Sequence, residues 1–173
     1  MLAAILADLG TDSPAAARQA RLAQLNAALL ARHQAGRRAV VYDNLTAGHR
    51  RAVRWCDLVE GDVQDEARVR AVIRDYGVTA VMHFAAWLSV GDSVRDPSGY
   101  YRNNVEGTLA LLRAMLAESV SQFVFSSTAA VYGEPEHTPI VEEHRTQPIN
   151  AYGETKLAVE RALLHFGGAY GLR

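Results

Sequence analysis

Cysteine is almost absent from this 173-residue sequence, in which Cys56 stands alone. A lone cysteine cannot form a disulfide within the chain, so a small secreted fold held by disulfides is excluded. We expect instead a reducing, cytoplasmic compartment and a buried or half-buried thiol. Long apolar runs are also missing. The opening stretch 1–9 is interrupted by Asp8, lacks a basic leader and is too short to span a bilayer, so it predicts neither a signal peptide nor a transmembrane helix.

An excess of charge of either sign is absent too. Eighteen Lys and Arg face nineteen Asp and Glu, which leaves a formal net charge of -1 and gives no electrostatic reason to expect nucleic acid or an anionic membrane as partner. A metal-binding motif is likewise missing, because no Cys, His, Asp or Glu stands at the sequence spacing from His83 that metal ligands usually have. We therefore interpret His83 as a core histidine. The length fits one domain.

Glycine is missing from residues 11–35, and this absence bears on the fold. A dinucleotide-binding fold carries a glycine-rich turn about 20 residues before the acid that binds the ribose. Here Gly10 marks at most a turn, and residues 2–6 are rich in alanine with one β-branched residue, which favours helix over strand. We expect residues 1–36 to be an alanine-rich helical segment, with a helix from Ser13-Pro14 to Gly36, and residues 37–173 to be a partial Rossmann-like domain.

Strand and helix patterns alternate through the rest of the chain. β-prone runs at 38–43, 58–61, 80–84 and 123–126 alternate with helical patterns at 65–77, 100–118 and 152–166. This alternation predicts an α/β fold with a doubly wound parallel sheet. The 123–126 run is interpreted as a buried strand that brings Thr128 to the carboxyl end of the sheet, and the loop 131–151 as one wall of a site there.

Tyr152 and Lys156 lie four residues apart, so they share one face of the last helix. An ammonium beside a phenol favours the phenolate, which is a general base. The pair alone is weak evidence, since such spacing is common in helices that only pack. It gains weight from Thr128, whose hydroxyl would meet the phenol and the amine at one substrate oxygen.

Acids follow two of the predicted strands. Asp43 stands where dinucleotide-binding folds place the acid that accepts hydrogen bonds from the ribose, and it would repel the extra phosphate of NADP, which favours NAD. Asp62 repeats the arrangement and would reach the adenine. Turn aspartates are the competing interpretation for both. The small residues Ala85 and Ala86 would let a cofactor approach the backbone. The two asparagines at 103–104 lie early in a predicted helix, where either one of them has a polar role or both belong to a solvated first turn.

Together these pieces resemble the extended short-chain dehydrogenase/reductase family (NAD-dependent epimerases and dehydratases), most closely its nucleotide-sugar 4-epimerases. The resemblance rests on Val-Tyr-Asp-Asn-Leu at 41–45, Gly-Asp-Val at 61–63, His-Phe-Ala-Ala at 83–86, Tyr-Tyr-Arg-Asn-Asn-Val at 100–105 with Gly-Thr at 107–108, Phe-Ser-Ser-Thr-Ala-Ala-Val-Tyr-Gly at 125–133 and Tyr-Gly-Glu-Thr-Lys at 152–156. It implies NAD as cofactor and a UDP-sugar as substrate, with interconversion of UDP-glucose and UDP-galactose through transient oxidation at carbon 4.

The resemblance also implies roles for single residues. Thr128 and Tyr152 would bind the 4-hydroxyl of the sugar, with Lys156 completing the catalytic set. The residues that would hold NAD are Asp43, Asn44, Asp62, Val63, Phe84, Ala85, Ala86, Asn103, Tyr152 and Lys156. Helices near 100–118 and 152–166 would pair in a homodimer.

Departures from the family pattern leave alternatives open. Ala129-Ala130 replaces the acids with which 4,6-dehydratases eliminate water, so epimerisation is favoured over dehydration, and Leu88 stands where some epimerases have a lysine. The sequence resembles a truncated member, because family members continue past the Tyr152 helix into a further strand and a substrate domain. A related nucleotide-sugar oxidoreductase or decarboxylase, or an inactive dimerising remnant, are the alternatives.

Overall fold

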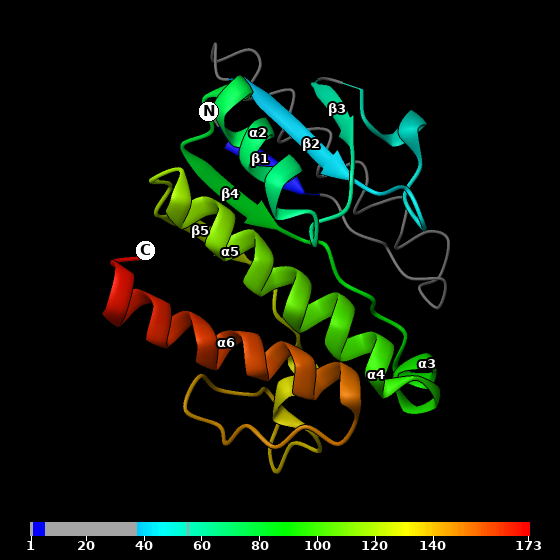
Figure 1. Cartoon of the computed structure of the whole chain (residues 1–173). Helices are drawn as coiled ribbons and strands as arrows, with labels where there is room; N and C mark the ends of the chain where they lie inside the picture. Colours follow the sequence, from blue (N-terminus) through cyan, green and yellow to red (C-terminus); the bar gives the residue numbers. More distant parts are fainter. Residues whose placement is uncertain (1, 6–37, 55) are drawn as a thin grey trace.

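A computed structural model describes residues 2–5, 38–54 and 56–173 of the chain. In these residues five parallel strands form one sheet in the order β3-β2-β1-β4-β5 (Figure 1). Their bounds are β1 Leu2–Ile5, β2 Ala39–Asp43, β3 Asp57–Glu60, β4 Ala80–His83 and β5 Gln122–Phe125. The predicted doubly wound α/β sheet is confirmed, and the order reverses between β1 and β4, where such sheets bind their ligands.

The first strand corrects the expectation of helix for residues 2–6. β1 runs between β2 and β4, and Leu2 is in register with Ala39 on one side and Ala80 on the other. Ladder hydrogen bonds from two neighbours satisfy its backbone groups, and this outweighs a helix preference worth only tenths of a kcal/mol per residue. The predicted helix from Ser13-Pro14 to Gly36 and the turn at Gly10 lie outside the described residues.

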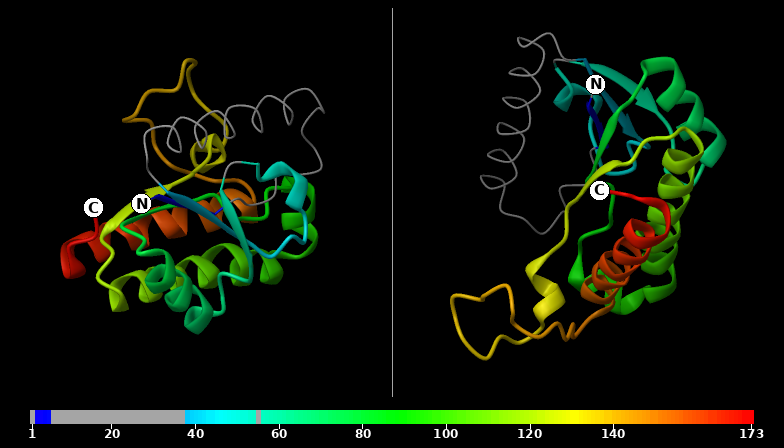
Figure 2. Two further views of the ribbon diagram at one scale, coloured as in Figure 1. Left: turned by 90° about the horizontal axis from the view of Figure 1, so that it is seen from above. Right: turned by 90° about the vertical axis from the view of Figure 1, so that its left-hand side faces the viewer.

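Local signals set the helix ends well. α2 (Glu66–Tyr76) begins after Asp65, whose side chain accepts a hydrogen bond from the Arg68 amide, and it ends at the left-handed Gly77. Together with α5 (Gly107–Ala117) and α6 (Ala151–Tyr170), α2 lies on the same side of the sheet, with α6 alongside α5 (Figure 2). The core between α2, α5 and the strands consists mainly of Val40, Val69, Ile73, Val81, Leu111, Leu112 and Met115.

The predicted helix 100–118 is less regular than its pattern suggests. α4 (Pro97–Tyr100) leads into a π-helical turn, η2 (Tyr101–Glu106), and only then into α5. Such wide turns are rare and occur frequently at functional sites. A short helix that the sequence pattern does not predict precedes α4: α3 (Val90–Arg95). Two 3-10 turns, η1 (Arg50–Ala52) and η3 (Ala129–Tyr132), complete the described elements.

β5 corrects a second expectation, because it is not a buried strand. It is the last strand in the sheet order, and the Val124 side chain is 53% exposed while Phe123 and Phe125 are half-buried. One face of this strand therefore lacks a cover among the described elements. After α6 the chain returns to β5, where the Phe123 amide donates to the carbonyl of Arg173 at 2.8 Å.

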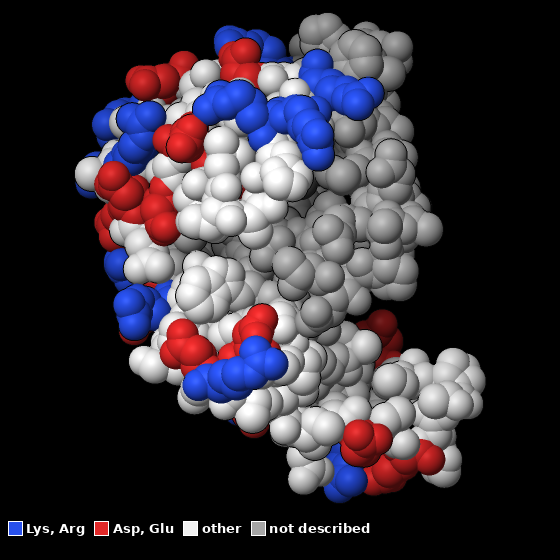
Figure 3. All heavy atoms as spheres, turned by 90° about the vertical axis from the view of Figure 1, so that its right-hand side faces the viewer, with Lys and Arg blue, Asp and Glu red and all other residues white. Residues whose placement is uncertain are grey.

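The surface mixes charges of both signs. On the face in Figure 3, arginine side chains gather toward the upper edge with acids among them, and the lower right lobe is mostly uncharged, with acids beside a basic side chain at its end. Pairs such as Arg50–Glu60, 2.7 Å apart and mostly exposed, contribute little to stability. No helix in the described part of the chain is long and apolar enough to cross a membrane.

Candidate active site at the β5–α6 junction

Lys156 is the buried cation at the junction between β5 and α6. Its side chain is only 3% exposed, its ammonium donates to the Ser126 carbonyl at 2.8 Å, and Nζ lies 4.8 Å from the centre of the Phe125 ring. Burial lowers the pKa of Lys156 to about 8, and the nearby carboxylate of Glu160 raises it. The ammonium is therefore held at neutral pH close to the point where it loses its proton.

Tyr152 and Thr128 lie on two turns that are each fixed by a capping residue. Asn150 begins α6 by accepting a hydrogen bond from the Gly153 amide at 2.9 Å, which fixes the turn that carries the buried Tyr152. Thr128 begins η3, and its hydroxyl accepts from the Ala130 amide. The two turns touch, because a Cβ on Gly153 would lie 2.6 Å from the Ala130 carbonyl. The predicted trio therefore converges on one junction.

Asn104 ties this junction to the chain after β4. Its amide nitrogen donates to the Thr155 hydroxyl and to the Trp87 carbonyl, both at 3.1 Å, and its amide oxygen accepts from the Trp87 amide at 2.8 Å. Asn104 is 2% exposed and lies in the π-helical turn. Of the two asparagines, it is Asn104 that has a buried polar role, while Asn103 donates to the Asn104 side chain.

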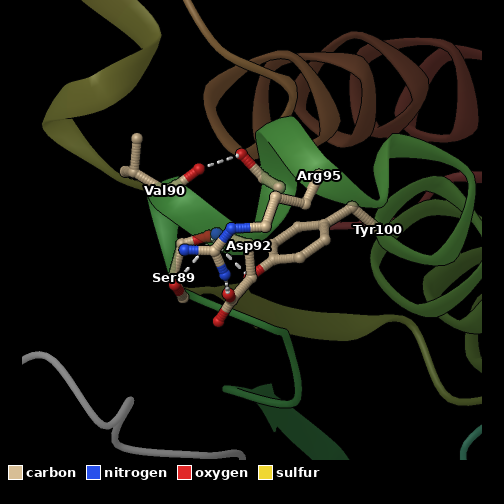
Figure 4. A network of polar contacts seen from close by, with 6 residues as sticks. Ser89, Val90, Asp92, Arg95 and Tyr100 are labelled. Atoms are coloured by element: carbon tan, nitrogen blue, oxygen red, sulfur yellow. Dashed lines mark hydrogen bonds and ion pairs between the residues drawn. The ribbon is translucent and has the colours of Figure 1, made fainter.

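The segment after Trp87 is held by a second polar network (Figure 4). Ser89 caps α3 through the Asp92 amide, and its carbonyl accepts a 2.6 Å hydrogen bond from the Tyr100 hydroxyl. Asp92 pairs with Arg95 on the exposed side of the same helix. The backbone between Ala86 and α4 is thus held by Asn104 at Trp87 and by Tyr100 at Ser89.

Asp43, Asn44 and Asp62 meet at the carboxyl ends of β2 and β3. The Asn44 amide donates to Asp62 at 3.0 Å, and one oxygen of Asp43 accepts from the Leu45 amide at 2.6 Å. Gly48 approaches closely, since a Cβ there would lie 3.0 Å from both oxygens of Asp43. These residues form a second group, separate from the Tyr152 junction but on the same edge of the parallel sheet.

The remaining predicted contacts differ in exposure. Val63 is 8% exposed, and its side chain packs in the core cluster. Phe84 and Ala85 are half-buried and Ala86 is 3% exposed, at the start of the loop after β4. The sequence places all of them at strand ends, and the structure keeps them there.

His83 is a core histidine, as expected. Thr108 donates its only hydroxyl hydrogen to the Asn104 carbonyl at 2.6 Å, so it must accept from His83 Nε2, 2.8 Å away. This fixes the tautomer and leaves Nδ1 buried without a hydrogen-bond partner in the described structure. Burial, assisted by the charge of Lys156, lowers the pKa of His83 to about 3, so the ring is neutral. No group of three metal-ligating side chains occurs in the described part of the chain.

Comparison with known proteins settles the family. The model of the NAD dependent epimerase/dehydratase family matches residues 24–173. The chain belongs to this family. A UDP-glucose 4-epimerase from Rhizobium leguminosarum bv. trifolii is 49% identical over 138 residues, and one from Corynebacterium glutamicum is 46% identical over 147 residues. This member of the family is therefore a homologue of UDP-glucose 4-epimerases.

Solved structures agree on the fold. The UDP-glucose 4-epimerase from Brucella ovis in complex with NAD matches with a TM-score of 0.85 and 44% identity, over 99% of this chain and 49% of that one. The enzyme from Thermotoga maritima with UDP-glucose matches with a TM-score of 0.81 and 27% identity. The chain spans less than half the length of the Rhizobium leguminosarum relative, 42%, and 80% of this chain is covered in that match.

In this epimerase homologue, two polar side chains at the same junction, Ser127 and Glu160, are not predicted from the sequence. Glu160 accepts a short hydrogen bond from the Ser127 hydroxyl, across 33 residues of sequence. The spacing of Glu160 four residues after Lys156 is a detectable signal, because it puts both on one helix face. Nothing in the sequence marks Ser127 as its partner.

Proposed function

We propose that this chain carries the catalytic and cofactor-binding centre of a UDP-glucose 4-epimerase, which interconverts UDP-glucose and UDP-galactose. The observation that carries the proposal is the buried ammonium of Lys156, held on the Ser126 carbonyl at the junction that also presents Thr128 and Tyr152. The 49% identity to a UDP-glucose 4-epimerase supports it.

NAD is the cofactor that the described residues fit. Asp43 offers a carboxylate at the end of β2, suited to the ribose hydroxyls, and the linked pair Asn44 and Asp62 stands beside it for the adenine. The half-buried Phe84 and Ala85 follow β4, the strand paired with β5, and Lys156 would meet the nicotinamide ribose. The residues that would hold NAD are Asp43, Asn44, Asp62, Val63, Phe84, Ala85, Ala86, Asn103, Tyr152 and Lys156.

The chain's own residues would move a proton at the sugar. NAD, when bound, supplies the means of taking a hydride from carbon 4 and returning it. Tyr152, as phenolate, would remove the proton of the 4-hydroxyl and later give it back. Thr128 would hydrogen-bond the same oxygen, and the Lys156 ammonium would favour the phenolate by its charge.

The test combines binding and turnover. Calorimetry of the 173-residue chain with NAD should give saturable binding, weaker than in a family member with a glycine-rich turn, because residues 11–35 contain no glycine. At saturating NAD the chain should convert UDP-galactose to UDP-glucose, followed by chromatography. Tyr152→Phe should keep the binding and lose turnover by about a hundredfold or more.

The alternatives give different outcomes in the same experiment. Net release of NADH with a keto or decarboxylated product would indicate a nucleotide-sugar oxidoreductase or decarboxylase, and neither binding nor turnover would indicate a remnant. Turnover that survives Tyr152→Phe would refute the role of the phenol.

We also propose that α6 contributes to a homodimer. Leu164 on this helix is 77% exposed and Phe166 is half-buried, so this part of α6 offers apolar side chains that a second copy of the helix would cover. Sedimentation should give a dimer at micromolar concentration, and Leu164→Glu should shift it to monomer. A monomeric wild-type chain would contradict the proposal.

A further inference from the structure

Two neighbouring turns of α6 hold two neighbouring residues of the chain that leaves β5. Lys156 donates to the carbonyl of Ser126, and Glu160, one turn later, accepts the hydroxyl hydrogen of Ser127. The next residue is Thr128. The backbone that presents the Thr128 hydroxyl is therefore fixed by side chains of the same helix that carries Tyr152.

The charges around Lys156 are few. His83 faces it from β4 but is neutral, the Phe125 ring faces it from β5, and the Tyr152 phenol lies one turn before it on α6. Glu160 is the carboxylate that favours the ammonium against the cost of burial. Glu160 also accepts the hydrogen bond from the Ser127 hydroxyl, and this bond holds its carboxylate at the junction.

We propose that Glu160 is a positioning residue of the site, which fixes the Ser127–Thr128 segment against α6 and places a carboxylate one helical turn from the Lys156 ammonium. The catalytic consequence of this inference rests on the proposed function, but the placement of Glu160 does not. Glu160 is not among the residues that the proposed function assigns to binding the substrate or the cofactor.

The sequence offers a direct probe, because Lys156 is the only lysine of the chain. Protein grown with lysine labelled with ¹³C at the ε carbon gives one side-chain resonance, whose chemical shift follows the loss of the ammonium proton. The experiment needs neither NAD nor sugar. In the wild-type chain the midpoint should lie near pH 8.

Variants separate charge from contact. Glu160→Gln keeps an oxygen for Ser127 but removes the charge, so the midpoint of Lys156 should move to lower pH. Ser127→Ala keeps the charge and removes the contact, so the midpoint should move less. Glu154→Gln is the matched control: Glu154 is exposed on the same helix, two residues before Lys156 and hence on another face, and its loss should leave the midpoint unchanged.

A paired variant guards against failure to fold. Ser127→Ala with Glu160→Leu removes donor and acceptor together, which is often nearly neutral for stability, and it should show the same downward shift as Glu160→Gln. An unchanged or raised midpoint in both Glu160 variants would overturn the proposal. An equal shift in Glu154→Gln would overturn it as well, because the effect would then be general charge.

Turnover distinguishes this inference from the proposed function. If the wild-type chain is active, Glu160→Gln should move the alkaline limb of the kcat profile to lower pH, with KM little changed. An inactive wild-type chain whose Lys156 midpoint falls in Glu160→Gln would defeat the proposed function and leave the placement of Glu160 standing.

Discussion

Asn104 donates a hydrogen bond from its side-chain amide to the Thr155 hydroxyl, 3.1 Å away and 51 residues later in the chain. Thr155 lies between Tyr152 and Lys156 on α6, and its hydroxyl donates a hydrogen bond to the Tyr152 carbonyl at 2.7 Å. The π-helical turn before α5 and the first turn of α6, which carries Tyr152, are thus joined by one buried pair.

Thr155→Val keeps the shape of the side chain and removes both bonds. We expect a loss of about 1–3 kcal/mol in the free energy of unfolding, because an amide hydrogen of Asn104 is left buried without its acceptor. Urea denaturation measures it. Thr146→Val, at an exposed position in the loop before α6, is the control and should change stability by under about 0.5 kcal/mol; equal effects would contradict the assigned contact.

Lys156→Met should stabilise the fold while abolishing turnover. A buried ammonium costs free energy, so its replacement by an apolar side chain of similar length should raise the free energy of unfolding by about 1–3 kcal/mol at pH 7. The folded-state pKa of about 8 lies below that of an unfolded lysine, so wild-type stability gains as pH rises through this range. The advantage of the variant should therefore shrink at pH 9.5, and a constant advantage would be inconsistent with it.

His83 should make the fold sensitive to acid. Its pKa is about 3 in the folded chain and near 6.5 when exposed, so the unfolded chain binds one more proton between these values. Stability should fall as pH decreases from about 6.5, with a slope of up to about 1.4 kcal/mol per pH unit from this group. His83→Gln, compared by urea denaturation at several pH values, should be less stable at pH 7 but show a smaller slope. An unchanged slope would mean that other groups cause it.

Two glycines of α6 should respond oppositely to alanine. Gly153→Ala would press its Cβ to 2.6 Å from the Ala130 carbonyl and separate the two turns that hold Thr128 and Tyr152. It should cost about 1–3 kcal/mol and most of any turnover. Gly168→Ala meets nothing within 4 Å and should gain about 0.5–1 kcal/mol through helix propensity. Thermal unfolding compares them, and matching losses would argue against the close contact at Gly153.

Local chemistry explains what the sequence predicted well. The cap at Asp65 and the left-handed Gly77 set α2 from residues a few positions apart, and the run before Asp43 sets β2. α3 had such a signal too, since Ser89 and Asp92 stand three apart like a helix-starting pair. Tyr152 and Lys156 could be predicted as a pair for the same reason, because their four-residue spacing within one helix is visible in the sequence.

Long-range pairing explains what the sequence could not give. β1 is alanine-rich and becomes a strand through neighbours 37 and 78 positions away, as the register of Leu2 with Ala39 and Ala80 shows. The exposure of Val124 depends on the place of β5 in the sheet order. The bond between Ser127 and Glu160 spans 33 residues, and no local pattern encodes it.

The position of β1 has a consequence for how the chain is made. The strand at the centre of the described sheet precedes its neighbours along the chain, yet its second neighbour, β4, is complete only at His83. Until then β1 can pair on one side alone, and closure of such distant contacts is slow. A tag or deletion that disturbs residues 2–5 would thus divide the sheet into β3-β2 and β4-β5 halves, each with an exposed inner edge that invites pairing with another chain.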